Sequence, residues 1–142
     1  MTARLYGAGL AAAFIFLFFV PGPYAAELRE SLSLESPALD RKLKYSLFLP
    51  DLPHSSPART PLPVLYLLHG LGGHERDWQK LGRITETASR LIENGDIPPM
   101  AIVMPDGANS WYVNSAKHGR YEDAFLDDLI PETERRHDIG GD

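Results

Sequence analysis

The sequence predicts an α/β domain in which an antiparallel hairpin leads into a parallel strand–helix–strand unit. Residues 42–49 alternate apolar and polar side chains, which indicates a strand with one buried face. Val64–Leu68 and Met100–Met104 are continuous apolar runs, as expected of parallel strands that are covered on both faces. Between these runs, apolar residues recur at helical spacing over residues 84–92.

The first element, residues 1–26, has the pattern of a signal peptide. Arg4 precedes an apolar run over residues 10–20, which Pro21 ends. This run is shorter than the roughly 20 residues that a transmembrane helix needs. We therefore expect export to the periplasm or the medium, with no stable membrane span after cleavage. The small residues Ala25–Ala26 satisfy the cleavage rule in part, so an uncleaved anchor stays an alternative.

The remaining residues, 27–142, are enough for one domain with its own core. The sequence has no cysteine, so this core must form without disulfides. Lys and Arg number 14 against 19 Asp and Glu, which gives a net charge of −5. This acidic balance argues against nucleic acid as a partner.

A hairpin is predicted to open the domain. The stretch 28–35 alternates at Leu32 and Leu34, and the turn-forming residues 36–40 separate it from the strand over 42–49. The following segment, 51–63, is rich in proline and serine and is expected to be a loop.

Two helices are predicted further along the chain. The first contains Ile84, Ala88, Leu91 and Ile92, and Gly95 follows it where a left-handed C-terminal cap would fall. The second is an amphipathic helix over about 121–136, which Pro131 kinks or restarts. Its apolar face consists of Tyr121, Phe125, Leu129 and Ile130.

Two loops are expected to meet at one edge of the sheet. Residues 69–74 (HGLGGH) follow the first parallel strand, and residues 105–112 (PDGANSWY) follow the second. Because parallel strands end at the same edge, both loops should lie where α/β proteins place their sites. Glycines let a backbone turn sharply and approach a ligand closely. Asn109, Trp111 and Tyr112 add a polar group and aromatic walls.

The glycine loop could serve several chemistries, and its residues exclude two of them. A dinucleotide-binding fingerprint needs glycine at position 75, where the chain has Glu75. No glycine is followed by Lys and Ser or Thr at the spacing of a P-loop. An oxyanion hole remains, in which a backbone N–H binds the negative oxygen that forms when an ester is attacked.

Six segments between Ser36 and Arg136 occur in an order and spacing more specific than any single motif. They are SPALDR at 36–41, YSLFLP at 45–50, VLYLLHG at 64–70, MPDG at 104–107, and YEDAF at 121–125 with LIP at 129–131. In this arrangement they resemble the N-terminal half of the putative esterase family of α/β-hydrolases. That family includes esterase D (S-formylglutathione hydrolase), feruloyl esterases and antigen 85 mycolyltransferases.

This resemblance implies a serine esterase that hydrolyses or transfers carboxylic esters through an acyl-enzyme, without cofactor or metal. The signal peptide expected at residues 1–26 would export it. The substrate would be a small-molecule or carbohydrate ester. In the family, the amide after the His-Gly pair binds the oxyanion, and that amide belongs to Leu71 here. Gly70 and Gly72, which flank it, are expected to bind the substrate together with Asn109, Trp111 and Tyr112, which would line the pocket.

The resemblance covers only the front half of such an enzyme. The family's nucleophile strand follows the helix that begins at Tyr121, so we expect residues 27–142 to be a partial domain, truncated before that strand. No serine stands in a Gly-x-Ser-x-Gly elbow; Ser110 and Ser115 follow Ala108 and Val113 at two residues' distance. Nucleophile, acid and base are therefore expected beyond Asp142, and the chain alone is expected to be inactive.

Other interpretations stay open. A non-catalytic exported carbohydrate-binding module of the same fold, or an unstable gene fragment with a bare apolar sheet edge, would also fit. His69, His74 and Asp77 could bind zinc, but they lack the helical H-E-x-x-H spacing. His69 is instead expected to pack at the strand end. Trp78 could line a pocket or face the core, and Asn109 could orient a substrate or close a turn.

Overall fold

The structure, a computed structural model, describes residues 26–50, 52 and 61–140. Residues 1–25 of the expected signal peptide and most of the expected loop at 51–63 lie outside the described residues. Within the described ranges, no helix is both long enough and apolar enough to cross a bilayer.

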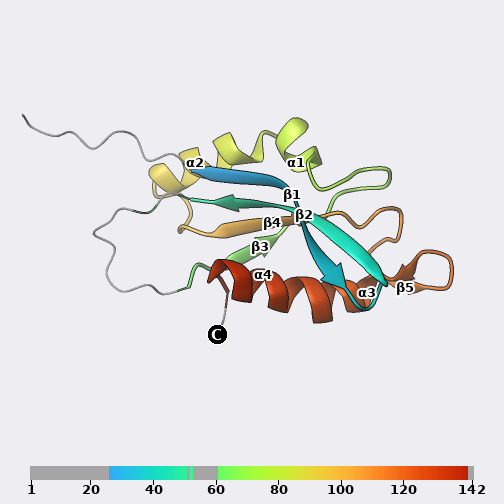
Figure 1. Cartoon of the computed structure of the whole chain (residues 1–142). Coiled ribbons are helices and arrows are strands. Elements are labelled where there is room, and N and C mark those ends of the chain that lie inside the picture. The colour runs from blue at the N-terminus through green and yellow to red at the C-terminus, as the bar shows by residue number, and fades with distance from the viewer. Residues whose placement is uncertain (1–25, 51, 53–60, 141–142) are drawn as a thin grey trace, which may run out of the picture.

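A four-stranded mixed sheet forms the centre of the fold, with strand order β1-β2-β4-β3 (Figure 1). Its strands are β1 (Glu27–Ser36), β2 (Arg41–Leu49), β3 (Val64–Tyr66) and β4 (Ala101–Pro105). β1 pairs antiparallel with β2, β2 pairs antiparallel with β4, and β3 runs parallel to β4. The predicted fold class, a hairpin leading into a parallel strand–helix–strand unit, is thus confirmed.

The alternation expected in β2 holds only in its first half. Lys42 and Lys44 are exposed and Leu43 is buried, but from Tyr45 to Phe48 every side chain is buried. The prediction of one buried face is wrong there because both faces of the sheet are covered at this point. β1 contains a bulge between Arg29 and Leu32.

The parallel unit departs from its prediction at the edge strand. β4 is buried throughout, as expected, whereas β3 is limited to three residues and the side chain of Leu65 is 40% exposed. The expectation that Val64–Leu68 is covered on both faces is wrong, because β3 is the edge of the described sheet. The Leu67 N–H still donates to the Val103 carbonyl at 2.9 Å, so the pairing continues beyond the strand.

The predicted helix between these strands is α2 (Ile84–Glu93), which a short helix α1 (Asp77–Lys80) precedes. Gly95 has a φ of +75°, and its N–H donates to the Ile92 carbonyl. The Asp96 N–H donates to the Leu91 carbonyl, which completes a Schellman motif. The glycine cap read from the sequence is confirmed.

The segment expected as one amphipathic helix is divided into three pieces. These are α3 (Tyr121–Asp123), the π-helical turn η1 (Ala124–Leu129) and α4 (Ile130–His137). Pro131 cannot donate a hydrogen bond, and its ring would crowd the preceding turn of a regular helix. The Ile130 N–H donates to the Phe125 carbonyl, five residues back, and the widened turn relieves this conflict. The helical backbone continues through η1, and Pro131 lies at the start of α4.

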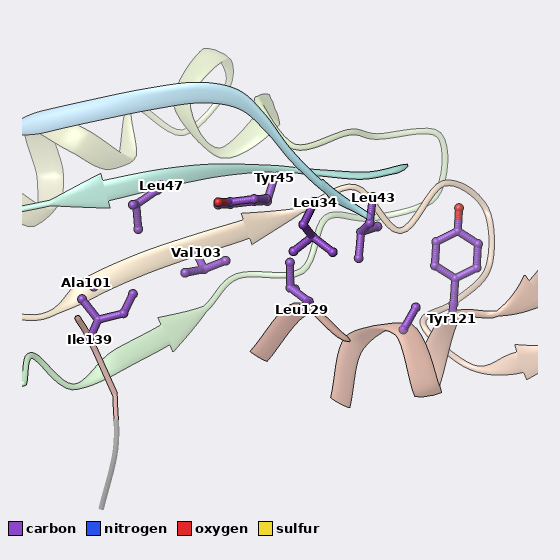
Figure 2. Packing of buried hydrophobic residues seen from close by; sticks show 10 residues of the cluster. Leu34, Leu43, Tyr45, Leu47, Ala101, Val103, Tyr121, Leu129 and Ile139 are labelled. Carbon is purple, nitrogen blue, oxygen red and sulfur yellow. The ribbon is translucent and has the colours of Figure 1, made fainter. Parts of the chain in front are cut away.

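Side chains pack on both faces of the sheet. Figure 2 shows the larger cluster, where apolar residues from β2 and β4 meet Leu129 of η1. On the other face, Phe48, Ile102 and Met104 pack against Ala88 of α2. A small hairpin, β5 (Asn114–Ser115) with β6 (Gly119–Arg120), precedes α3 and was not expected from the sequence.

His137 at the end of α4 is expected to make stability depend on pH. Its Nε2 lies 2.9 Å from the Tyr45 hydroxyl, and burial, with Arg29 and Arg136 nearby, lowers the pKa of His137 below its usual 6.5. The unfolded chain therefore binds this proton more readily, so the free energy of unfolding should fall as the pH drops from about 6.5 toward the lowered pKa. Denaturant unfolding across pH 5 to 7.5 should show a flatter slope in His137→Gln, and an unchanged slope would contradict this account.

Candidate active site

The loops that follow β3 and β4 are in direct contact. The Gly72 N–H of the first loop donates to Asn109 Oδ1 of the second at 3.0 Å. The Gly107 N–H of the second loop donates to His69 Nε2 of the first at 2.9 Å. The two segments expected at one edge of the sheet are thus joined by these two hydrogen bonds and by a third, from the His69 N–H to the Tyr112 hydroxyl. Asn109 closes this contact with its side-chain oxygen.

His69 is a structural link between the loops. Its side chain is only 3% exposed, which agrees with the expectation that it packs at the strand end. Nδ1 lies 2.7 Å from the Gly70 carbonyl oxygen, which can only accept, so Nδ1 carries the hydrogen. Nε2 then has the free lone pair that accepts from Gly107. Both ring nitrogens are occupied, and His69 does not act as a catalytic base in this arrangement.

Tyr112 braces the same contact. Its hydroxyl donates to the Pro105 carbonyl at 3.1 Å and accepts from the His69 N–H at 3.3 Å. Burial raises the pKa of Tyr112 to about 12, so the phenol stays a hydrogen-bond donor at neutral pH. A Cβ at Gly107 would collide with the Tyr112 ring, which explains why the loop needs glycine at that position.

The second loop has a strained backbone. Ala108, Trp111 and Tyr112 have φ angles of +46°, +59° and +56°. Such conformations cost on the order of 1–3 kcal/mol each and cluster at functional sites. Ser110 stabilises the turn because its buried hydroxyl donates to the Gly107 carbonyl at 2.6 Å and accepts from the Tyr112 N–H. Ser110 is therefore a turn residue, and the turn leaves the Trp111 indole 74% exposed.

The Leu71 N–H makes no hydrogen bond within the part of the chain that the structure describes. Leu71 is 72% exposed and lines two cavities. A cavity of about 80 Å³ lies between the loops, and one of about 570 Å³ lies toward α1. The smaller is lined by His69, Gly70, Leu71, Ala108, Asn109, Trp111 and Tyr112. Leu71 thus lines both cavities, and its backbone N–H has no acceptor among the described residues.

Trp78 belongs to the larger cavity and not to the core. Its indole N–H donates to the Leu68 carbonyl at 3.2 Å, and the side chain is 37% exposed. The sequence left open whether Trp78 lines a pocket or faces the core, and the structure places it in the lining of the cavity. Leu81, with no assigned role from the sequence, lines the same cavity.

The three residues considered as zinc ligands, His69, His74 and Asp77, do not converge on one point. His74 Nε2 lies 3.1 Å from Asp77 Oδ1, and His69 faces the second loop. In the described ranges, no group of three or more His, Asp or Glu side chains is placed to hold a metal ion.

Glu75 is a buried anchor that sequence reasoning missed. Its carboxylate accepts a hydrogen bond from the Ser31 hydroxyl of the β1 bulge at 2.7 Å. Burial alone would raise the pKa of Glu75, but this bond and the neighbouring His74 and Arg76 hold the pKa below its usual value. The contact joins residues 44 positions apart, so no local pattern could reveal it.

A glycine loop and a second, strained loop at the carboxyl ends of parallel strands define an α/β-hydrolase-type chain. The chain belongs to the family described as Putative esterase, whose model matches residues 36–133. The resemblance to the putative esterase family that the sequence indicated is thereby confirmed.

Two curated relatives carry esterase names. The chain is 34% identical over 74 residues to an acetyl esterase of Caldicellulosiruptor saccharolyticus, covering 52% of this chain and 25% of the relative. It is 33% identical over 73 residues to an endo-1,4-beta-xylanase/feruloyl esterase of Xylanibacter ruminicola, covering 49% of this chain and 10% of the relative. The alignments thus span a quarter or less of these relatives.

Solved structures show the same fold. A ferulic acid esterase matches with a TM-score of 0.74 and 26% identity over 84% of this chain and 48% of that chain. An S-formylglutathione hydrolase of Staphylococcus aureus matches with a TM-score of 0.57 and 24% identity over 81% of this chain and 42% of that chain, which supports the fold alone. The chain therefore spans about half the length of these solved esterases.

Proposed function

We propose that the chain supplies the oxyanion-binding part of an exported serine esterase or acyltransferase that acts on carboxylic esters. The observation that carries this proposal is the Leu71 N–H, which has no acceptor among the described residues and lies beside two cavities where the parallel strands end. Membership of the putative esterase family also supports an esterase function.

The proposed chemistry is acyl transfer through a covalent intermediate. A serine oxygen attacks the ester carbonyl, and the Leu71 N–H stabilises the negative oxygen that forms. The alcohol leaves with a proton, and water or a sugar hydroxyl then takes the acyl group from the serine. One such donor contributes about 3–4 kcal/mol to the transition state in a preorganised site. We place the nucleophile, acid and base in a segment beyond Asp142.

The proposed substrate is a small acyl ester of a carbohydrate or of the cell envelope. Named relatives include an acetyl esterase and a xylanase/feruloyl esterase, and one solved relative is described in complex with ferulic acid. Trp111 and Tyr112 would form an aromatic wall of the pocket, and Asn109 would hold Gly72 in place at its edge. Export, inferred from residues 1–26, makes an intracellular glutathione thioester a less suitable substrate.

The test is to express the protein from its entire coding region and to compare it with residues 27–142 alone. The complete protein should hydrolyse p-nitrophenyl acetate and methyl ferulate and react with a fluorophosphonate at a serine outside residues 27–142. Residues 27–142 alone should show no turnover. Turnover by this fragment that a Gly72→Pro change abolishes would overturn the placement of the nucleophile. A complete protein without esterase activity or labelling would refute the function.

A further inference from the structure

We infer that His69 is a positioning residue, whose ring fixes the peptide that carries the oxyanion-binding N–H and ties it to the second loop. This inference rests on the proposed function of the Leu71 amide. The His69 side chain is only 3% exposed and acts through the backbone of its own loop.

The peptide between Gly70 and Leu71 is planar. In a trans peptide the carbonyl of one residue and the N–H of the next belong to one rigid plane and point in opposite directions. His69 Nδ1 donates to the Gly70 carbonyl at 2.7 Å, and the Gly73 N–H donates to the same oxygen at 3.0 Å. Fixing that oxygen therefore also fixes the direction of the Leu71 N–H, which must point away from the His69 ring.

The imidazole ring of His69 is itself attached to the second loop. Nε2 accepts the Gly107 N–H of the second loop at 2.9 Å, and the side chain is almost fully buried. The Tyr112 ring lies edge-on at 5.6 Å between centroids, so the imidazole cannot swing freely. The second loop, held by its own turn, thus sets the position of the Leu71 N–H through the two nitrogens of one ring.

The hydrogen bonds of the His69 ring select one tautomer. The arrangement requires a neutral ring with hydrogen on Nδ1, because Gly107 needs a lone pair on Nε2. Asp106 Oδ1 lies 3.6 Å from Nε2 and could pair with a protonated nitrogen instead. That carboxylate oxygen already accepts the Ala108 N–H at 2.9 Å. The shorter Gly107 contact therefore favours the unprotonated Nε2.

Two substitutions of His69 distinguish the role of Nδ1 from the role of Nε2. In His69→Asn the amide nitrogen takes the place of Nδ1 and can still donate to the Gly70 carbonyl. In His69→Gln the side-chain amide reaches the place of Nε2 and can still accept from Gly107, but the bond to Gly70 is lost. If His69 acts by orienting the peptide, the asparagine variant should keep most of kcat. The glutamine variant should lose about tenfold in kcat, the effect of one hydrogen bond, with little change in KM.

The experiment combines kinetics of the complete protein with ¹⁵N spectroscopy of its histidines. We expect His69 to show a protonated Nδ1 and an unprotonated Nε2 at pH 7. We expect kcat to decrease in the order wild type, His69→Asn, His69→Gln. His118→Asn, on the turn between β5 and β6, is the matched control and should leave kcat unchanged. A protonated Nε2, or a glutamine variant as active as the asparagine variant, would overturn the inference. Absent esterase activity in the wild type would refute the proposed function, while the spectrum would still test the tautomer.

Discussion

Replacing Leu71 by proline is expected to lower kcat of the complete protein by about 100- to 1,000-fold, the usual effect of removing one oxyanion donor. Proline has no N–H, and the Leu71 N–H makes no hydrogen bond within the described residues that the change would break. KM should change little, because the lost interaction belongs to the transition state. Steady-state kinetics with p-nitrophenyl acetate measures both constants.

Leu71→Ala is the control for this prediction. It removes the exposed side chain and keeps the amide, so kcat should stay within a few-fold of the wild type. Equal thermal unfolding midpoints for both variants would show that the fold is unchanged. A proline variant that keeps full kcat while folding normally would remove Leu71 from the proposed oxyanion hole.

Replacing Leu129 by alanine is expected to have the largest effect on stability, a loss of about 2–5 kcal/mol in the free energy of unfolding. Leu129 is fully buried in η1 and packs in the larger core cluster (Figure 2). Leu126 lies in the same π-helical turn, but its side chain is 52% exposed. Leu126→Ala should change stability by less than about 0.5 kcal/mol.

Denaturant unfolding of the two leucine variants side by side measures this difference. The matched pair keeps helix propensity and residue type constant, so the difference reports burial alone. Similar losses in both variants would mean that the π-helical turn does not place Leu129 in the core as described.

The parts of the fold that follow from local periodicity could be predicted from the sequence. The alternation over residues 28–49 and the apolar runs at 64–68 and 100–104 identify the hairpin and the parallel strands. The glycine after α2 marks its end because only a left-handed residue completes the cap. The widened turn η1 could not be predicted from the sequence. It depends on Pro131 and on how the buried side chains of Ala124 and Leu129 pack against the sheet.

The burial of individual strands depends on neighbours that periodicity does not reveal. An apolar run predicts a strand that can be covered on both faces, and β4 agrees with this. β3 has the same composition but lies at the edge of the described sheet, so Leu65 remains partly exposed. Strand order, and not the sequence of the strand, decides the difference.

At the candidate site, topology predicted the meeting of the two loops but not how they are joined. The carboxyl ends of β3 and β4 had to lie together, and the loops that follow them do. The roles of the ring of His69, the buried Glu75 and the strained residues at 108–112 depend on contacts between distant residues. No spacing in the sequence encodes those contacts, so they had to be read from the structure.

The most direct test of the oxyanion assignment is a crystal structure of the complete protein after reaction with a fluorophosphonate. The phosphoryl oxygen of the serine adduct stands for the oxyanion of the ester reaction. We predict that this oxygen lies about 2.7–3.1 Å from the Leu71 nitrogen, in hydrogen-bond geometry. An adduct whose oxygen lies elsewhere, with the Leu71 N–H bonded to another group of the protein, would contradict the assignment.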